Sequence, residues 1–181
     1  MITRKMETQL RMEAGKILQQ TGFPLTAVEL ESIAIADFGL SNPYEEGAQI
    51  LTLFATDRIS AKLIVLFPHQ TLPEHWHPPV GDDPGKEEII RGYWGTTLCF
   101  TEGGTEPLSK KAPTSKHQYY TATTCHTLEP GSQIIIPPGQ KHWLKGGPTG
   151  GVVMSFSTCV RDILDEFSDP AIVRTTKIVD D

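Results

Sequence analysis

The chain begins with a segment in which apolar residues recur every three or four positions. Met6, Leu10 and Ile17 follow this spacing among Lys, Arg, Glu and Gln residues. The spacing matches one face of an α-helix, and it predicts an amphipathic helix over residues 3–20. A second, short helix is expected over residues 26–32, between turns that Pro24 and Pro43 indicate.

From about residue 49 the pattern changes to short runs of aliphatic and β-branched residues. Turn signals such as Glu129-Pro130-Gly131 and Gly146-Gly147-Pro148 separate these runs, and the polar stretch 103–116 is interpreted as a surface loop. Short strands at this spacing are typical of an all-β sandwich or barrel. The expected strands cover residues 50–54, 59–67, 88–101, 119–128, 133–136, 142–145 and 152–158.

The length and composition predict a single folded domain over residues 1–181. The chain is 38% hydrophobic and 21% charged, which is ordinary for a protein that buries its own core. Residues 1–47 would form a helical and irregular N-terminal extension, residues 48–160 the barrel core, and residues 161–181 a C-terminal tail. The net charge of −6 argues against a nucleic-acid-binding protein, which needs a basic face.

The sequence also predicts a soluble, cytoplasmic protein with no membrane partner. The first residues lack the apolar run of a secretion signal, and no stretch of 18 uncharged apolar residues occurs. The cysteines Cys99, Cys125 and Cys159 are odd in number and widely spaced. This usage does not suit a disulfide framework, and we expect all three to be small buried residues in strands.

Four side chains that commonly bind metals are spaced as they would be in a barrel. His75 and His77 are two residues apart, so on a strand both would point to the same face. Glu88 follows eleven residues after His77, and His142 comes after a Pro-Pro-Gly turn. Three imidazoles and one carboxylate can bind a divalent metal such as Mn²⁺, Fe²⁺, Zn²⁺ or Ni²⁺.

The spacing around these residues resembles the two sequence motifs of cupin barrels. The second motif is reproduced by Gly131, Pro137, Gly139 and His142, and the end of the first by Glu88 and Gly95. The resemblance implies an all-β cupin fold, a double-stranded β-helix or jelly-roll barrel, carrying the N-terminal helix as an extension.

Three departures from the cupin pattern are visible. Ten residues separate His77 from Glu88, where cupins usually have three or four. His69 stands where the first motif often has Gly, and Gly146 where the second often has Asn. The longer spacing indicates a shaped loop at the barrel mouth, which would bring Lys86 close to the metal.

A closer resemblance is carried by residues 73–88, with the sequence PEHWHPPVGDDPGKEE. Residues 36–40, 139–147 and 167–170 support it. These segments resemble the D-lyxose isomerase family of cupins. The resemblance implies a Mn²⁺-dependent aldose–ketose isomerase, usually a homodimer, whose substrate is a sugar such as D-lyxose or a related aldose. It also implies metal ligands at His75, His77, Glu88 and His142, and a catalytic lysine at Lys86.

Lys86 is therefore the expected proton-transfer group, with Glu87 as the fallback. Burial and a neighbouring cation would both lower the pKa of Lys86, which would make it a base near pH 7. Trp94 shares parity with Glu88 and is expected to face inward and bind the sugar. Trp76 and Trp143 have the opposite parity to the adjacent histidines, and both are expected on the outer side or at a dimer interface.

The C-terminal part departs from the family at Ser155, Ile163 and Ala171, where acidic residues or an Arg are common. These departures do not affect the predicted metal ligands. They concern sugar recognition or proton transfer, so the sequence does not assign a second proton-transfer residue. Two alternatives therefore stay open: a cupin dioxygenase that uses Fe²⁺ on the same ligands, and a sugar-binding cupin without catalysis. The metal is expected to be Mn²⁺, with Fe, Zn, Ni and Co as the other options.

Overall fold

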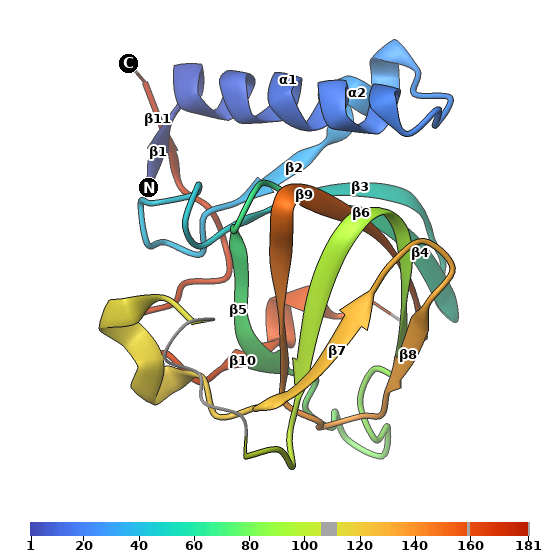
Figure 1. The fold of residues 1–181 in the computed structure, drawn as a ribbon, viewed down its shortest axis with the longest axis vertical. Coiled ribbons are helices and arrows are strands. Elements are labelled where there is room, and N and C mark those ends of the chain that lie inside the picture. Colours follow the sequence, from blue (N-terminus) through green and yellow to red (C-terminus); the bar gives the residue numbers. More distant parts are fainter. Residues whose placement is uncertain (106–111, 159, 181) are drawn as a thin grey trace.

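The long strands run antiparallel and curl around one interior in the computed structural model, which describes residues 1–105, 112–158 and 160–180 (Figure 1). The sheet order is β10-β5-β9-β4-β3-β2, where β2 is Ala34–Ala36 and β10 is Glu166–Phe167, and β6 also pairs with β7, β8 and β9. The main strands are β3 (Ala48–Ala55), β4 (Ile59–Leu66), β5 (Thr71–Trp76), β6 (Glu88–Thr101), β7 (Thr124–Leu128), β8 (Gln133–Ile136) and β9 (His142–Thr158). This arrangement confirms the predicted all-β architecture.

Both predicted helices form, and each begins at a capping threonine. The Oγ1 of Thr3 accepts a hydrogen bond from the Met6 N–H at the start of α1 (Arg4–Gln20). Thr26 and Glu29 form a reciprocal capping box at the start of α2 (Ala27–Ser32). Such caps satisfy the N–H groups that the first helical turn leaves free.

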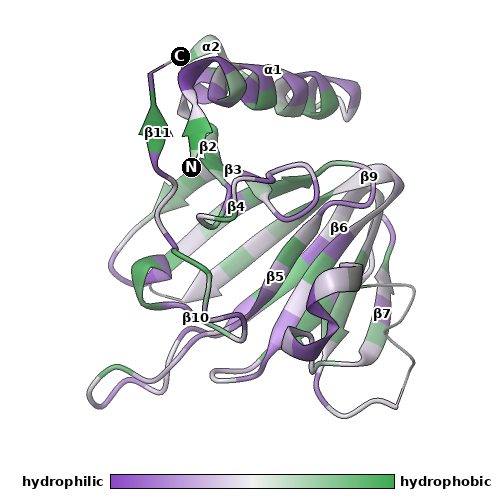
Figure 2. Ribbon diagram, turned by 90° about the vertical axis from the view of Figure 1, so that its left-hand side faces the viewer, coloured by the Kyte–Doolittle hydropathy of each residue, from purple (hydrophilic) through white to green (hydrophobic). Residues whose placement is uncertain are grey.

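Helix α1 lies across the outside of the sheet (Figure 1), and hydrophobic and hydrophilic positions alternate along it and along the strands (Figure 2). Its buried Leu10, Ala14 and Leu18 pack against Leu51 and Leu63 of β3 and β4. A second apolar cluster fills the barrel interior and includes Cys99, which is fully buried as expected. Cys125 is partly buried, and Cys159 lies outside the described residues.

One predicted turn, at Gly146-Gly147-Pro148, does not end a strand in the structure. Residues 142–145 and 152–158 belong to one continuous strand, β9, and the predicted turn at Gly146-Gly147-Pro148 lies inside it. The pairing register with β6 shifts between Gly95 and Thr97 at this point. Glycines let the strand bend here and pass close to its neighbours, so the chain continues instead of reversing.

A second correction concerns residues 119–123, which are not part of a strand. Tyr119 is the last residue of the 3₁₀ helix η2 (Thr114–Tyr119), and β7 begins only at Thr124. The N–H groups of Thr121 and Ala122 donate to the buried Glu74 carboxylate, at 2.6 Å and 2.7 Å, and not to a neighbouring strand. The residues of the predicted 103–116 loop between 106 and 111 lie outside the described residues.

Five strands were not among those predicted: β1 (Ile2–Thr3), β2 (Ala34–Ala36), β5 (Thr71–Trp76), β10 (Glu166–Phe167) and β11 (Ile178–Val179). Strand β10 matters most, because it pairs with the end of β5 and places Phe167 opposite His75. This pairing brings the C-terminal segment, including the 3₁₀ helix η3 (Asp162–Leu164), over the barrel mouth.

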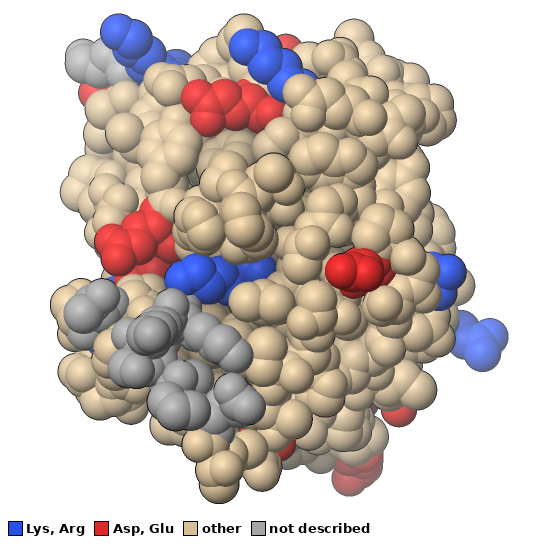
Figure 3. All heavy atoms as spheres, viewed as in Figure 1, with Lys and Arg blue, Asp and Glu red and all other residues tan. Residues whose placement is uncertain are grey.

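The helices of the described part of the chain are too short or too polar to cross a membrane. On the face shown in Figure 3, basic and acidic side chains are separated by large uncharged areas, and the described atoms there form no continuous basic surface.

Candidate metal centre

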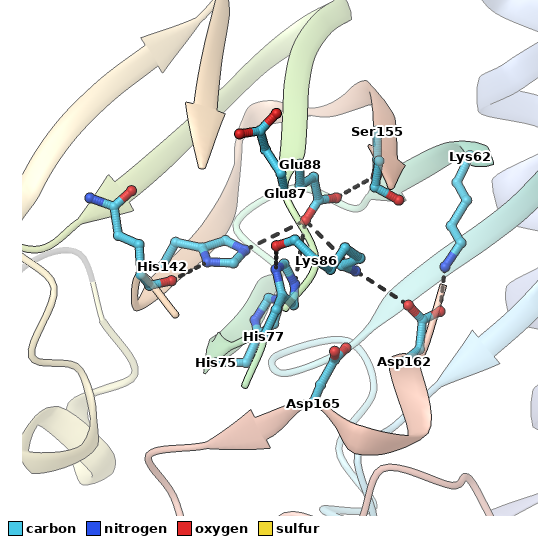
Figure 4. A network of polar contacts seen from close by, with 12 residues as sticks. Lys62, His75, His77, Lys86, Glu87, Glu88, His142, Ser155, Asp162 and Asp165 are labelled. Carbon is cyan, nitrogen blue, oxygen red and sulfur yellow. Dashed lines mark hydrogen bonds and ion pairs between the residues drawn. The ribbon is translucent and has the colours of Figure 1, made fainter. Parts of the chain in front are cut away.

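Two neighbouring strands bring three of the predicted side chains together at the barrel mouth (Figure 4). His75 lies near the end of β5 and pairs directly with His142, the first residue of β9. His77 follows the end of β5, and Glu88 begins β6. The predicted common orientation of His75 and His77 is therefore confirmed.

The four side chains face one another in a buried cluster. One nitrogen from each of His75, His77 and His142 lies within 4.8 Å of the others. The Glu88 Oε2 is 3.5 Å from His77 Nε2 and 3.8 Å from His142 Nε2. Each of the four residues is at most 8% exposed.

Backbone carbonyls fix the tautomer of all three imidazoles. The Nδ1 of His75 lies 2.9 Å from the Pro73 carbonyl oxygen, that of His77 3.2 Å from the Lys86 oxygen, and that of His142 3.0 Å from the Gln140 oxygen. A carbonyl oxygen only accepts, so each Nδ1 carries the hydrogen and donates it. Each Nε2 is then left with a lone pair that points into the cluster.

The imidazoles are also held in the neutral form that binds metals. Burial and the neighbouring imidazoles keep the pKa of His75 well below its usual value. Burial, followed by the Lys86 charge, lowers the pKa of His77 to about 3. Burial likewise lowers the pKa of His142. All three side chains are therefore unprotonated at neutral pH.

Glu88 supplies the negative charge of the cluster. Burial alone would raise the pKa of its carboxyl, but Lys86 and the histidines outweigh burial and lower the pKa to about 2. The Ser155 hydroxyl also donates to Glu88 Oε1. Glu88 is thus a carboxylate at neutral pH.

This set of donors can hold a metal ion. His77 Nε2 is buried and has no hydrogen-bond partner, a costly arrangement for a polar atom unless another group binds it. Three imidazole lone pairs and one carboxylate suit a first-row divalent cation. The histidine cluster therefore fits the metal that the sequence motifs imply.

A cavity opens beside the cluster, and two kinds of side chain line it. The apolar ones are Phe38, Ile50, Ile64, Leu72, Ile90, Leu144 and Phe167. The charged ones are Lys62, Lys86, Asp162, Asp165 and Arg174, together with His75, His142 and Glu88 of the cluster. A small polar ligand can therefore reach the cluster and several charged side chains at once.

Lys86 lies in this cavity as expected, but its charge state differs from the expectation. Burial lowers the pKa of Lys86, whereas Glu88, Asp165 and Asp162 raise it more strongly, so that the pKa lies above its usual value. The Nζ is 3.3 Å from Asp162 Oδ1 and 3.9 Å from Glu88 Oε2. Lys86 is therefore an ammonium ion that can donate a proton. Burial lowers the pKa as predicted, but Glu88 and two aspartates of the tail, whose approach the sequence did not show, outweigh burial. The part of the prediction that depends on a bound cation stays a prediction.

The inward position predicted for Trp94 is wrong. The register between β6 and β9 shifts between Gly92 and Trp94, so that one extra residue of β6 is inserted there. Such a bulge reverses the side-chain alternation that places Glu88 and Ile90 inside. Trp94 packs in the cluster beneath α1 and is not among the residues that line the cavity.

The other two tryptophans lie away from the cavity. Trp143 is fully buried in a cluster beneath η2, where its ring stacks on Phe100 with centroids 3.8 Å apart. The Lys141 Nζ lies 4.9 Å from the Trp76 ring. Glu87, the fallback base, is exposed and does not line the cavity, in agreement with the alternation that points it away from Glu88.

Four charged residues of the cavity were not predicted: Lys62, Asp162, Asp165 and Arg174. Lys62 had one detectable signal, because it is a single charge inside the aliphatic run of β4. The others belong to the tail, whose position depends on the pairing of β10 with β5. No local pattern in the sequence reports that pairing.

The departures from the family pattern have different structural consequences. Ser155 contacts Glu88, so the missing carboxylate at that position would lie beside the metal cluster. Ile163 is 68% exposed and Ala171 is also exposed, and neither lines the cavity. His69 has a φ of 61°, which explains why cupins often place Gly there.

The chain is similar in sequence to several curated proteins over nearly its full length. It is 45% identical over 169 residues to a D-lyxose ketol-isomerase from Cohnella laeviribosi, covering 92% of each chain. It is 38% identical over 181 residues to a D-lyxose/D-mannose isomerase from Thermosediminibacter oceani, covering 99% of this chain and 100% of the relative. No protein-family model matches the chain.

Solved structures support the fold class. L-ribose isomerase from Cellulomonas parahominis superimposes with a TM-score of 0.81 at 16% identity, covering 98% of both chains. L-ribose isomerase from Acinetobacter sp. DL28, in complex with L-ribose, gives a TM-score of 0.81 at 17% identity. These likenesses confirm the predicted cupin fold with an N-terminal helix. The identity to curated relatives over nearly the whole chain shows that this protein belongs to the D-lyxose isomerase family.

Proposed function

We propose that this protein is a metal-dependent isomerase that interconverts D-lyxose and D-xylulose, or a related pair such as D-mannose and D-fructose. The names of the curated relatives support the substrate class. The observation that carries the proposal is the convergence of three Nε2 lone pairs and the Glu88 carboxylate beside a cavity that contains Lys86. That combination suits a reaction in which a proton leaves a carbon next to a carbonyl group.

His75, His77, His142 and Glu88 would hold the metal, which we propose to be Mn²⁺. When bound, a divalent cation polarises the sugar carbonyl and stabilises the negative charge that develops on its oxygen. The histidines contribute by presenting Nε2 at fixed positions, because their Nδ1–H groups are anchored to the backbone. Fe, Zn, Ni and Co remain the other options for the same donor set.

Lys86 would transfer a proton at the sugar oxygens. Its ammonium group lies in the cavity, within 3.9 Å of Glu88 Oε2. Asp162 orients it with a contact of 3.3 Å. From this place Lys86 can donate a proton to the carbonyl oxygen as the neighbouring carbon loses its own, and later recover a proton from the other oxygen.

The test is to remove metal with a chelator, reload the protein with Mn²⁺, and supply a panel of pentoses and hexoses. We expect conversion of D-lyxose to D-xylulose only in the reloaded protein, with D-mannose as the next best substrate. The variant Lys86→Met is expected to keep its bound Mn²⁺ and lose at least about 100-fold in turnover number. Unchanged turnover in this variant would remove Lys86 from the mechanism.

The same experiment separates the two alternative functions. Oxygen consumption by the Fe²⁺-loaded protein, without ketose formation, would identify a dioxygenase. A sugar that stabilises the protein without being converted would identify a binding protein. Absence of turnover on every sugar, with metal bound, would overturn the isomerase proposal.

We also propose that the protein acts as a homodimer in the cytoplasm. An apolar row crosses five strands through residues paired in register, with the small Ala61 buried and the other four at least partly exposed: Phe54, Ala61, Phe156, Ile89 and Ile135. Phe54 and Ile135 are 47% and 57% exposed. A row of this kind supports an interface between two copies. The buried Cys99 is a free thiol, which agrees with a reducing compartment.

A further inference from the structure

Two aspartates of the C-terminal segment lie side by side in the cavity wall but have very different partners. Asp162 and Asp165 are three residues apart at the two ends of η3, and both line the cavity that contains the metal cluster. Figure 4 shows both carboxylates directed towards the region of Lys86. Their different surroundings give them different chemical roles.

Asp162 is surrounded by cations. Its carboxylate forms ion pairs with Lys62, with Lys86 at 3.3 Å and with Arg174 at 3.5 Å. Burial raises the pKa of Asp162, but Lys86 and Lys62 outweigh burial and lower the pKa to about 2. Asp162 is therefore a permanent carboxylate that holds its lysines in place.

Asp165 is poorly compensated although it is just as close to the cavity. Its side chain is 10% exposed, and the nearest cation is the Arg174 Nε, at 3.9 Å from Oδ2. Burial raises the pKa of Asp165 to about 7, with Asp162 and Glu88 adding to the rise, while Lys86 and Arg174 oppose it. These four are the charged groups that face it from η3, β6, the loop before β6 and the C-terminal segment. A carboxyl that gains and loses a proton near neutral pH is suited to acid–base catalysis.

Asp165 also borders the space that a sugar in the cavity would occupy. It borders two adjoining hollows, one shared with His75, His142 and Glu88, and the other with His77 and Lys86. It is thus close to the metal cluster without being part of it. In the described part of the chain, Asp162 and Asp165 are the only aspartates that line the first hollow. Asp162 is already engaged in ion pairs with Lys62 and Lys86, which leaves Asp165 as the aspartate available to a ligand.

We propose that Asp165 is the catalytic base that carries the sugar's carbon-bound proton, a role beyond the metal ligands and Lys86. The Asp165 carboxylate takes the proton from C2, the C2–H electron pair forms the C1=C2 double bond, and Lys86 donates a proton to the carbonyl oxygen on C1. Asp165 then returns its proton to C1, the O2–H bond reforms the carbonyl at C2, and the O2 proton passes back to Lys86. This inference rests on the proposed isomerase function.

The test compares Asp165→Asn with Glu166→Gln, a control that removes a carboxylate from the exposed neighbouring residue. With Mn²⁺ and D-lyxose, Asp165→Asn is expected to lose about 10²- to 10⁴-fold in kcat with little change in KM. In D₂O, the wild type should incorporate deuterium at C2 of the recovered sugar, and Asp165→Asn should not. Glu166→Gln should behave like the wild type in both measurements.

A measurement without metal or substrate tests whether Asp165 has only a structural role. Burial and the neighbouring Asp162 both disfavour the charged form of Asp165. Replacing it by Asn should therefore leave the unfolding temperature unchanged at pH 4 and raise it at pH 8, relative to the wild type. A lower unfolding temperature at both pH values would indicate a structural role and overturn the proposal. Wild-type-like exchange in Asp165→Asn would also overturn it, whereas absence of turnover in the wild type would instead overturn the proposed function.

Discussion

Each histidine of the cluster owes its chemical state to one backbone hydrogen bond and to burial. The carbonyls of Pro73, Lys86 and Gln140 hold the Nδ1–H groups, so that Nε2 faces the cluster without a proton. In the unfolded chain the same imidazoles protonate near pH 6.5. Below about pH 6.5 the folded chain therefore binds fewer protons at these three histidines than the unfolded chain does.

The stability of the metal-free protein should consequently fall as the pH is lowered. The three histidines have depressed folded-state pKa values, so each contributes stability that is lost below about pH 6.5, at about 1.4 kcal/mol per pH unit. Asp165 has a raised folded-state pKa of about 7 and acts in the opposite direction over this range. The net loss between pH 6 and 5 is expected to be about 3 kcal/mol per unit, because three protons oppose one.

Urea unfolding of chelator-treated protein at pH 5, 6 and 7 measures this loss. The variant His75→Gln removes one of the three groups and should reduce the slope against pH by about one proton. A free energy of unfolding that does not change between pH 7 and 5 would show that the imidazoles are not held neutral.

The sequence predicted the cluster residues well but the rest of the cavity poorly. His75, His77, Glu88 and His142 were found because strand alternation and motif spacing are local properties. The prediction for Trp94 was wrong because one extra residue is inserted in β6, and no pattern in the sequence indicates that bulge. Asp165 was missed because its position depends on β10 joining a distant strand.

Among the elements, the loop between β5 and β6 determines where Lys86 lies. The loop contains two glycines with positive φ, Gly81 at 60° and Gly85 at 107°. A Cβ at Gly85 would lie 2.5 Å from the His77 carbonyl oxygen, whereas a Cβ at Gly81 would meet nothing within 4 Å. The two positions therefore differ in steric surroundings while sharing the left-handed backbone.

This pair offers a matched test of the loop. Gly81→Ala should cost about 1 kcal/mol of unfolding free energy, from the left-handed backbone alone. Gly85→Ala must also move the backbone of His77, so we expect a loss of about 2 to 4 kcal/mol and weaker Mn²⁺ binding. Denaturant unfolding and metal titration measure both effects. Equal losses in the two variants would show that the contact with His77 is not restrictive.

The helices and long strands were predictable because their signals are local, and the exceptions are instructive. The 3–20 helix and the strands 88–101 and 133–136 match α1, β6 and β8 within a residue. The strand predicted over residues 119–123 does not form. The buried carboxylate of Glu74 accepts the hydrogen bonds of backbone N–H groups that would otherwise bind a neighbouring strand. Tertiary partners of this kind are invisible to hydrophobic periodicity.

At the scale of the whole molecule, the apolar row on the outer face of the sheet leaves large hydrophobic side chains in contact with water. Cross-strand pairing aligns Phe54, Phe156, Ile89 and Ile135 around the buried Ala61. The upper part of the same sheet face is covered by α1, whereas this part is not. A second copy would remove these side chains from water.

We expect the protein to sediment at twice its chain mass of 20.0 kDa. The double variant Phe54→Glu with Ile135→Glu should sediment as a monomer, because it places charges at both ends of the row. Val28→Glu, on the 79% exposed Val28 of α2, is the control and should remain dimeric. A wild type that sediments at 20.0 kDa at micromolar concentration would contradict the proposed dimer.

The short pairing of β10 with β5 separates two properties of the molecule. The side chains that would hold the metal all come from residues 75–142, whereas two further carboxylates of the cavity, Asp162 and Asp165, come from the C-terminal segment. Metal ligands and the remaining cavity carboxylates therefore occupy separate stretches of the chain. Substitutions at residues 162–165 are accordingly expected to change turnover without weakening the binding of the metal.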